Sequence, residues 1–119
     1  VLNDPRFTFG RDYIFFRQDA TRGPNKIGLR QREGWAAYQR EEMLFVKYFD
    51  CVADAEYPDG NVNSEYFSNE AMLEVESLGP LVSLQQDESA SHTETWKLFA
   101  PVARCESEAD VDRLIKPLV

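Results

Sequence analysis

The stretch Met72–Leu81, MLEVESLGPL, decides the fold class. Its apolar and polar residues alternate, and alternation at period two is typical of a β-strand whose two faces meet different surroundings. One face carries two carboxylates, Glu74 and Glu76, and Gly79-Pro80 ends the run. Carboxylates on a strand usually face bulk water, but a pair of them aimed at a cleft would form part of a binding site.

Similar short runs lie on both sides of this stretch, and turn residues separate them. The predicted strands are Asp12–Gln18, Gly34–Arg40, Met43–Phe49, Val62–Ser68, Met72–Leu78, Leu81–Leu84 and Ser89–Phe99. Turns are predicted at Arg22–Gly28, Glu56–Asn61, Asn69–Ala71 and Gln85–Ser89, where Gly, Pro, Asn and Asp gather. Short strands separated by closely spaced turn signals are typical of an antiparallel sandwich.

The hydrophobic period changes near the C-terminus. Ser107, with Asp110 three residues later, has the spacing of a helix start that caps its own first turn. The apolar residues that follow recur at helical spacing: Val111, Leu114 and Ile115. Pro117 is expected to end this helix. The sequence therefore predicts an all-β antiparallel sandwich with a short C-terminal helix, in one domain over residues 1–119.

Composition and charge exclude several classes of function. The net charge of −8 argues against nucleic-acid binding, which needs a basic surface, and no apolar run is long enough to span a bilayer. Cys51 and Cys105, with a single histidine, are too few for a zinc site, and no glycine-rich phosphate loop is present. We expect two free thiols, with one disulfide as the alternative, and no metal or other cofactor.

Several predicted strands carry a face that mixes large apolar side chains with ionisable or polar ones. One face of Ser89–Phe99 holds His92, Glu94 and Trp96, and Trp96 is expected to be part of the core. Comparable faces on other strands carry Lys47, Asn63 and Glu65. Apolar walls with a few convergent polar groups describe a ligand site, although a solvated or structural role is more common for any one of these residues.

Each ionisable candidate has a role that its chemistry suits. Glu74 or Glu76 could act as a general acid or base, or hold a sugar hydroxyl by hydrogen bonding. His92 could transfer a proton near neutral pH. A metal held by one of the glutamates together with His92 is a further alternative, but their spacing matches no metal signature.

The ordered segments GWAAY, LFVKYF, YPDGNVNSEYFSN, MLEVESLGPLVSLQQDES and SHTETWKLF resemble the C-terminal half of a family of uncharacterised bacterial proteins. That family is related to the galactose mutarotases, or aldose 1-epimerases. The resemblance covers Pro24 to Phe99, and the block LEVESLGPLVSLQQDESASHTETW is its most specific part.

The resemblance implies that the chain is part of a β-supersandwich and that its ligand is a sugar or another small polyhydroxy compound. It assigns Glu76, or alternatively Glu74, as the base that removes the proton of the anomeric hydroxyl. Substrate-binding roles are expected for residues on the neighbouring strands: Lys47, Asn63, Glu65, His92 and Glu94.

The chain departs from the mutarotase pattern in two ways. Mutarotases take their acid, a histidine, from an earlier part of the chain, whereas His92 follows the glutamate strand. The supersandwich is also about twice this length, so we expect a fragment or half, with isomerase activity only when the missing half completes it. The alternative is a non-catalytic structural or interaction module, which would form an oligomer or pair with a missing half through open sheet edges.

Overall fold

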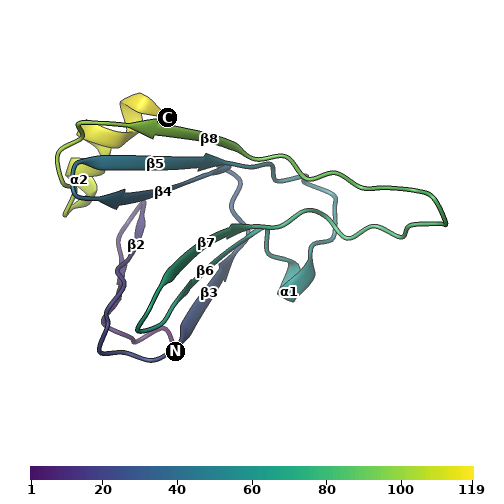
Figure 1. The fold of residues 1–119 in the computed structure, drawn as a ribbon, viewed down its shortest axis with the longest axis horizontal. Coiled ribbons are helices and arrows are strands. Elements are labelled where there is room, and N and C mark those ends of the chain that lie inside the picture. Colours follow the sequence, from purple (N-terminus) through teal and green to yellow (C-terminus); the bar gives the residue numbers. More distant parts are fainter.

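The computed structural model describes all 119 residues, and antiparallel strands make up most of its regular structure (Figure 1). The strands are β1 (Phe7–Phe9), β2 (Ile14–Phe16), β3 (Asn25–Leu29), β4 (Trp35–Arg40), β5 (Met43–Tyr48), β6 (Ser64–Ser68), β7 (Leu73–Ser77) and β8 (Thr95–Phe99). They form a β1-β2 ribbon and two three-stranded sheets, ordered β3-β6-β7 and β4-β5-β8. The prediction of an all-β, sandwich-like fold with a short C-terminal helix is confirmed.

Two hairpins lie at the centre of the chain, each formed by two of the predicted strands. β4 pairs with β5 over their full lengths, and Glu41 in the connecting turn has a left-handed φ of 55°. β6 pairs with β7, and the turn between them is closed by Asn69, whose Oδ1 accepts from the backbone N–H groups of Ala71 and Met72. This side-chain bond to the backbone explains why the Asn-Glu-Ala segment makes a tight turn.

The turn predicted at Arg22–Gly28 is wrong for its second half, where β3 forms. β3 pairs with β6 from Asn25↔Ser68 to Leu29↔Ser64, so ladder hydrogen bonds outweigh the local turn preference. Gly28 suits this strand because a side chain there would press against Val62, with a Cβ 3.1 Å from its Cγ2. The sequence also did not predict β1. This strand pairs with β2, which lies within the strand predicted at Asp12–Gln18.

The turn predicted at Glu56–Asn61 is confirmed as the single short turn α1 (Pro58–Asn61). Positive φ angles occur at three successive residues of this turn, Asp59, Gly60 and Asn61. Asp, Gly and Asn adopt positive φ more readily than other residues, so the sequence suits this turn. Asn61 also accepts from the backbone N–H of Tyr57 and binds Arg30 through its side-chain oxygen.

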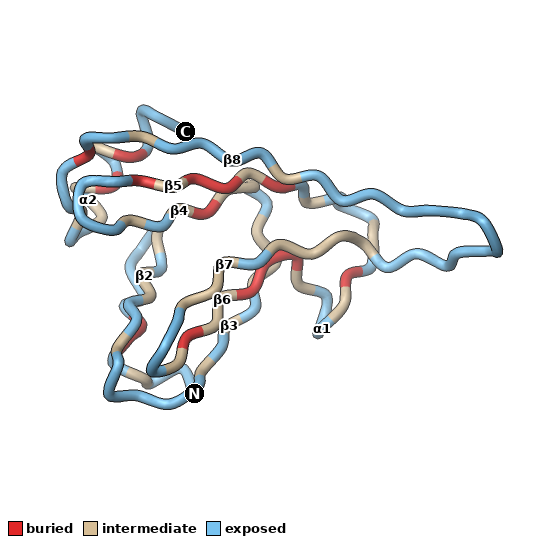
Figure 2. Tube along the Cα trace, viewed as in Figure 1, coloured by how far each residue is buried: buried red, intermediate tan, exposed pale blue.

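One predicted strand is absent and another is shorter than predicted. Leu81–Leu84 is not a strand, and the long run Ser89–Phe99 is a strand only in its second half, β8. The intervening residues form a long loop that projects from the body of the molecule and is exposed along most of its length (Figure 2). No neighbouring strand lies beside this loop to supply ladder hydrogen bonds, so its alternating sequence stays unpaired.

The predicted C-terminal helix is confirmed, and it runs through α2 (Glu108–Asp110), the π-helical turn η1 (Val111–Ile115) and the 3-10 turn η2 (Lys116–Leu118). The Ser107 Oγ accepts from the Asp110 N–H, as the spacing predicts. Asp110 in turn accepts from the Glu106 N–H through its side chain. This reciprocal pair satisfies backbone donors that a helix start leaves free.

The hydrophobic core lies between this helix and one face of the β4-β5-β8 sheet. Its buried members are Leu44, Val46, Val102, Val111 and Ile115. The register places the remaining face of β5 and β8, with Lys47 and Trp96 opposite each other, toward the β3-β6-β7 sheet. The expectation that Trp96 is part of the core is wrong, because this face is only partly covered and Trp96 is 64% exposed.

Candidate functional site

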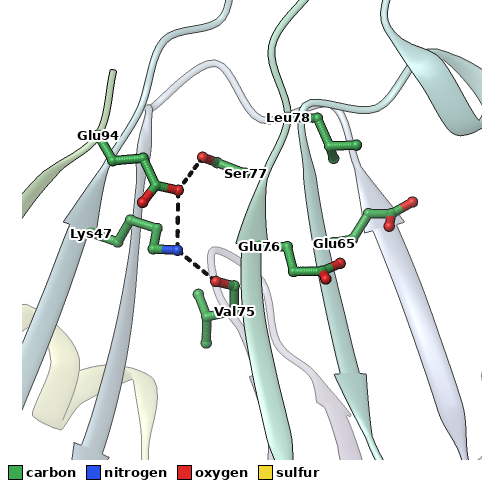
Figure 3. Close-up of a pocket in the computed structure, with 7 residues that line it drawn as sticks. All are labelled: Lys47, Glu65, Val75, Glu76, Ser77, Leu78 and Glu94. Atoms are coloured by element: carbon green, nitrogen blue, oxygen red, sulfur yellow. Dashed lines mark hydrogen bonds and ion pairs between the residues drawn. The ribbon is translucent and has the colours of Figure 1, made fainter. Parts of the chain in front are cut away.

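A groove of about 440 Å³ opens where the end of β7 meets β5 and the segment leading into β8. Its lining combines polar and apolar side chains: Lys47, Glu65, Val75, Glu76, Ser77, Leu78 and Glu94 (Figure 3). Four of the predicted site residues are therefore brought to one place from three different strands and a loop. Ser77, which sequence reasoning did not single out, joins them.

Glu94 is the centre of the hydrogen bonds on one side of the groove. Its Oε1 accepts from the Ser77 hydroxyl and lies 3.1 Å from the Lys47 Nζ. Its Oε2 accepts from the Trp96 Nε1 at 2.8 Å. Both oxygens are thus engaged by side chains from β5, β7 and β8, and they fix the relative positions of those strands.

Lys47 joins the two sheets directly. Its Nζ donates to the backbone carbonyl of Val75 at 2.7 Å and pairs with Glu94, and its side chain is only 11% exposed. The Nζ also lies 5.7 Å from the centre of the Trp96 ring, within range of a cation–π attraction. Because a buried ammonium is costly without partners, these contacts explain how a lysine is accommodated between two sheets.

Hydrogen bonding determines the charge of Glu94. Burial acts to raise its pKa, but the bonds from Ser77, Trp96 and Lys47, with the charge of Lys47, outweigh burial and lower the pKa overall. The carboxylate is therefore ionised at neutral pH, and it can accept but not donate.

Glu65 and Glu76 lie on the other side of β7. They are directly opposite each other in the β6-β7 ladder, and Figure 3 shows both pointing away from Lys47 and Glu94. Glu65 is buried and pairs with Lys26 on β3, whose Nζ lies 3.0 Å from its Oε2. Two carboxylates opposite each other repel, and Lys26 offsets that repulsion for Glu65. Glu76 lines the groove and is exposed, and its carboxylate has no hydrogen-bond or ion-pair partner within the chain.

The remaining predicted residues lie outside the groove lining. Asn63 is fully buried, and its side chain bonds the backbone of Gln31 in both directions and the carbonyl of Asp50. Glu74 shares a face with Glu76 but precedes it by two residues in β7 and lies opposite Phe67. His92 is exposed on the loop, with its Nε2 2.7 Å from the Ser77 Oγ, so it contacts the groove only through Ser77.

The signal that could have identified Ser77 is present in the sequence. In Met72–Leu78, Ser77 is the only hydroxyl on the face that also carries Leu73 and Val75. A lone polar residue on an apolar strand face needs a partner, and in the structure that partner is Glu94.

The structure also describes the two cysteines and the remaining acidic and histidine side chains. Cys51 and Cys105 are both free and half-buried, as expected. No group of three or more His, Cys, Asp or Glu side chains is arranged to hold a metal ion. None of the helices has the length and apolar character that crossing a bilayer requires.

Comparison of the chain with family models, curated proteins and solved structures gives no match.

Proposed function

We propose that the chain binds a neutral polyhydroxy ligand, a sugar, in the groove at the end of β7. The observation that carries the proposal is the contrast between Glu76, which has no protein partner, and Glu94, whose two oxygens are fully engaged. An unpartnered carboxylate accepts from ligand hydroxyls, and adjacent sugar hydroxyls offer such donors in pairs. The apolar side chain of Leu78, which follows Glu76 by two residues and also lines the groove, provides a wall against which a sugar ring would pack.

Charge favours a neutral ligand over an anionic one. Three carboxylates line the groove with a single ammonium, that of Lys47, which already pairs with Glu94. An anion would therefore meet Glu76 without a free cation to offset the repulsion. A sugar without acidic groups avoids this cost.

The proposal is for binding, with Glu76 as the base position that the resemblance assigns. Ring opening at an anomeric carbon needs an acid opposite the base. His92 does not line the groove, and Lys47 is held by Val75 and Glu94. The described groups thus account for recognition of a sugar more directly than for turnover.

Titration calorimetry with D-galactose, D-glucose and a disaccharide tests this proposal. Glu76→Gln is expected to weaken binding about tenfold, which corresponds to ~1.4 kcal/mol for loss of a charge-assisted hydrogen bond. Glu74→Gln is the matched control, because it removes a carboxylate from the same face of β7 outside the groove lining, and we expect unchanged affinity.

Equal weakening by both variants, or no heat of binding with any of the sugars, would rule out the groove as the sugar site. Polarimetry of freshly dissolved D-galactose separates binding from catalysis. We expect mutarotation at the uncatalysed rate, and an acceleration that Glu76→Gln abolishes would instead assign Glu76 as a catalytic base.

A further inference from the structure

The segment that precedes β8 has the sequence of a strand but no strand beside it. Apolar and polar residues alternate through Ser89–Phe99, yet only Thr95–Phe99 is paired, with β5. The backbone N–H and C=O groups of residues 89–94 make no hydrogen bond with the rest of the chain. They are therefore free to pair with an external strand, as are the outward groups of β8.

β8 is an edge strand, because the order of its sheet is β4-β5-β8. Its first four residues are exposed, and the two large apolar ones, Trp96 and Leu98, are 64% and 69% exposed. Natural edge strands are usually protected by a covering element, a bulge, a proline or inward-pointing charges. Within β8 only the charged residue Lys97 offers such protection. Its Nζ lies over the ring of Tyr48, on the face of the sheet opposite Trp96 and Leu98.

Charge distinguishes between the two kinds of strand that could add to this edge. The loop of residues 79–94 contains Asp87, Glu88 and Glu94 and no Lys or Arg, and the whole chain carries a net charge of −8. A second copy would bring the same acidic loop and the same net charge to the contact, so repulsion disfavours it. A basic segment is attracted both to the acidic loop and to the negative net charge of the chain.

We propose that the edge formed by residues 89–99 binds an extended, basic, amphipathic strand of a partner polypeptide. The partner strand pairs with β8 and extends the ladder over residues 89–94, which then become a continuation of β8. Its apolar side chains cover Trp96 and Leu98, and its Lys or Arg side chains lie near Asp87 and Glu88. This inference does not depend on ligand binding in the groove.

Synthetic peptides provide the test. The probe is a peptide in which Val alternates with Lys and Thr, and the two control peptides replace Lys by Glu or carry N-methyl groups on alternate backbone nitrogens. Amide hydrogen exchange of the full chain is measured by NMR with each peptide. The Lys peptide is expected to slow exchange of residues 89–94 by about tenfold or more, while the control peptides leave it unchanged.

Two proline variants locate the contact. Thr93→Pro places a proline in the unpaired half of the edge, where no intramolecular hydrogen bond is lost, and is expected to abolish the peptide-dependent protection. Ser83→Pro, on the other limb of the same loop, is the matched control and should leave protection intact.

Absence of protection with the Lys peptide overturns the proposal. It is equally overturned if residues 89–94 are protected in the protein alone and sedimentation shows a dimer, because a second copy would then occupy the edge. Equal protection by the Lys and Glu peptides would overturn the basic character of the partner.

Discussion

Lys47 connects the two sheets through one nitrogen atom. Its Nζ contacts the carbonyl of Val75 on β7 and the carboxylate of Glu94 ahead of β8. Lys47→Met keeps the volume and apolar stem but leaves both oxygens without this donor. We expect a loss of roughly 2 kcal/mol in the free energy of unfolding, less than for a fully buried pair because Glu94 is 21% exposed. Urea denaturation of the variant and the unmodified chain measures this loss in the free energy of unfolding.

Lys97→Met is the matched control, since Lys97 lies on the same sheet and its Nζ makes no hydrogen bond or ion pair but lies over the ring of Tyr48. We expect a change of about 0.5 kcal/mol or less in the free energy of unfolding.

The pH dependence of the Lys47→Met effect gives a second check. The pKa of Glu94 is lowered in the folded protein, so its contribution is present above the ordinary carboxylate pKa and is lost as pH falls through the folded value. The Lys47→Met effect should therefore shrink in acid, and an effect independent of pH would contradict the assigned partner.

At the residue scale, alternation placed most side chains on the correct strand faces but could not assign partners across sheets. Glu65, Glu76, Glu94 and Lys47 were all expected at the site from their strand faces, and all line the groove. The sequence could not show that Glu76 and Glu94 lie on opposite sides of β7, because that depends on how one sheet is placed against the other.

At the element scale, the C-terminal helix is attached to the segment before β2 by polar contacts as well as by the core. Glu108 Oε1 accepts from the backbone N–H groups of Asp12 and Tyr13, each at 2.8 Å. The Tyr13 hydroxyl donates to Asp112 at 2.6 Å, and this hydrogen bond is the main cause that raises the pKa of Tyr13 to about 12. Two helix residues about one turn apart, Glu108 and Asp112, thus contact the same short part of the N-terminal segment, Asp12 and Tyr13.

Tyr13→Phe tests this attachment. We expect a loss of about 1 kcal/mol at neutral pH, the size of a hydrogen bond to a charged group discounted for its exposure. Because the folded pKa is raised, the stabilisation is fully present below the ordinary tyrosine pKa of 10 and is lost as pH rises toward 12. Denaturation curves of the two proteins should therefore converge between pH 10 and 12.

Glu108→Gln provides the comparison, because it weakens the neighbouring contact without a group that titrates in this range. Its difference from the unmodified chain should change little from pH 10 to 12, because the charge of Glu108 makes the smallest contribution to the raised pKa of Tyr13. A Tyr13→Phe difference that also stays constant would show that the hydroxyl does not donate to Asp112.

Local patterns predicted elements well where pairing partners are close in sequence. The β4-β5 and β6-β7 hairpins and the capped helix all form from neighbouring segments. β3 was missed because it pairs with a strand far along the chain, and the length of β8 was overestimated because the outer half has no neighbour. Long-range pairing, or its absence, overrides local propensity in both cases.

At the scale of the whole molecule, the chain is less compact than its length allows. Its radius of gyration is 15.7 Å, whereas a compact domain of this length is expected near ~13.5 Å. Only 15 of 119 residues are buried, and the core lies on the helix side of the β4-β5-β8 sheet. The face toward the other sheet therefore keeps large apolar side chains in water, among them Met43, Trp96 and Leu98.

This exposed face predicts dye binding by the folded protein. Trp96 and Leu98 are adjacent on one strand face, beside Phe45 and Lys47 on β5, so they form a continuous apolar surface. The neutral dye Nile red is expected to fluoresce with the native chain, and the Trp96→Thr/Leu98→Thr variant should remove most of that signal. Threonine is chosen because it favours a strand and should leave β8 intact.

The matched control is Leu81→Thr/Val82→Thr. These two residues are about as exposed, at 55% and 58%, but they lie in the projecting loop and not on a sheet face. A dye needs a contiguous surface, so the control should keep most of its fluorescence. Circular dichroism verifies that both variants are folded. If the loop variant loses the signal and the β8 variant keeps it, the dye binds the loop and the inner sheet face is covered in solution.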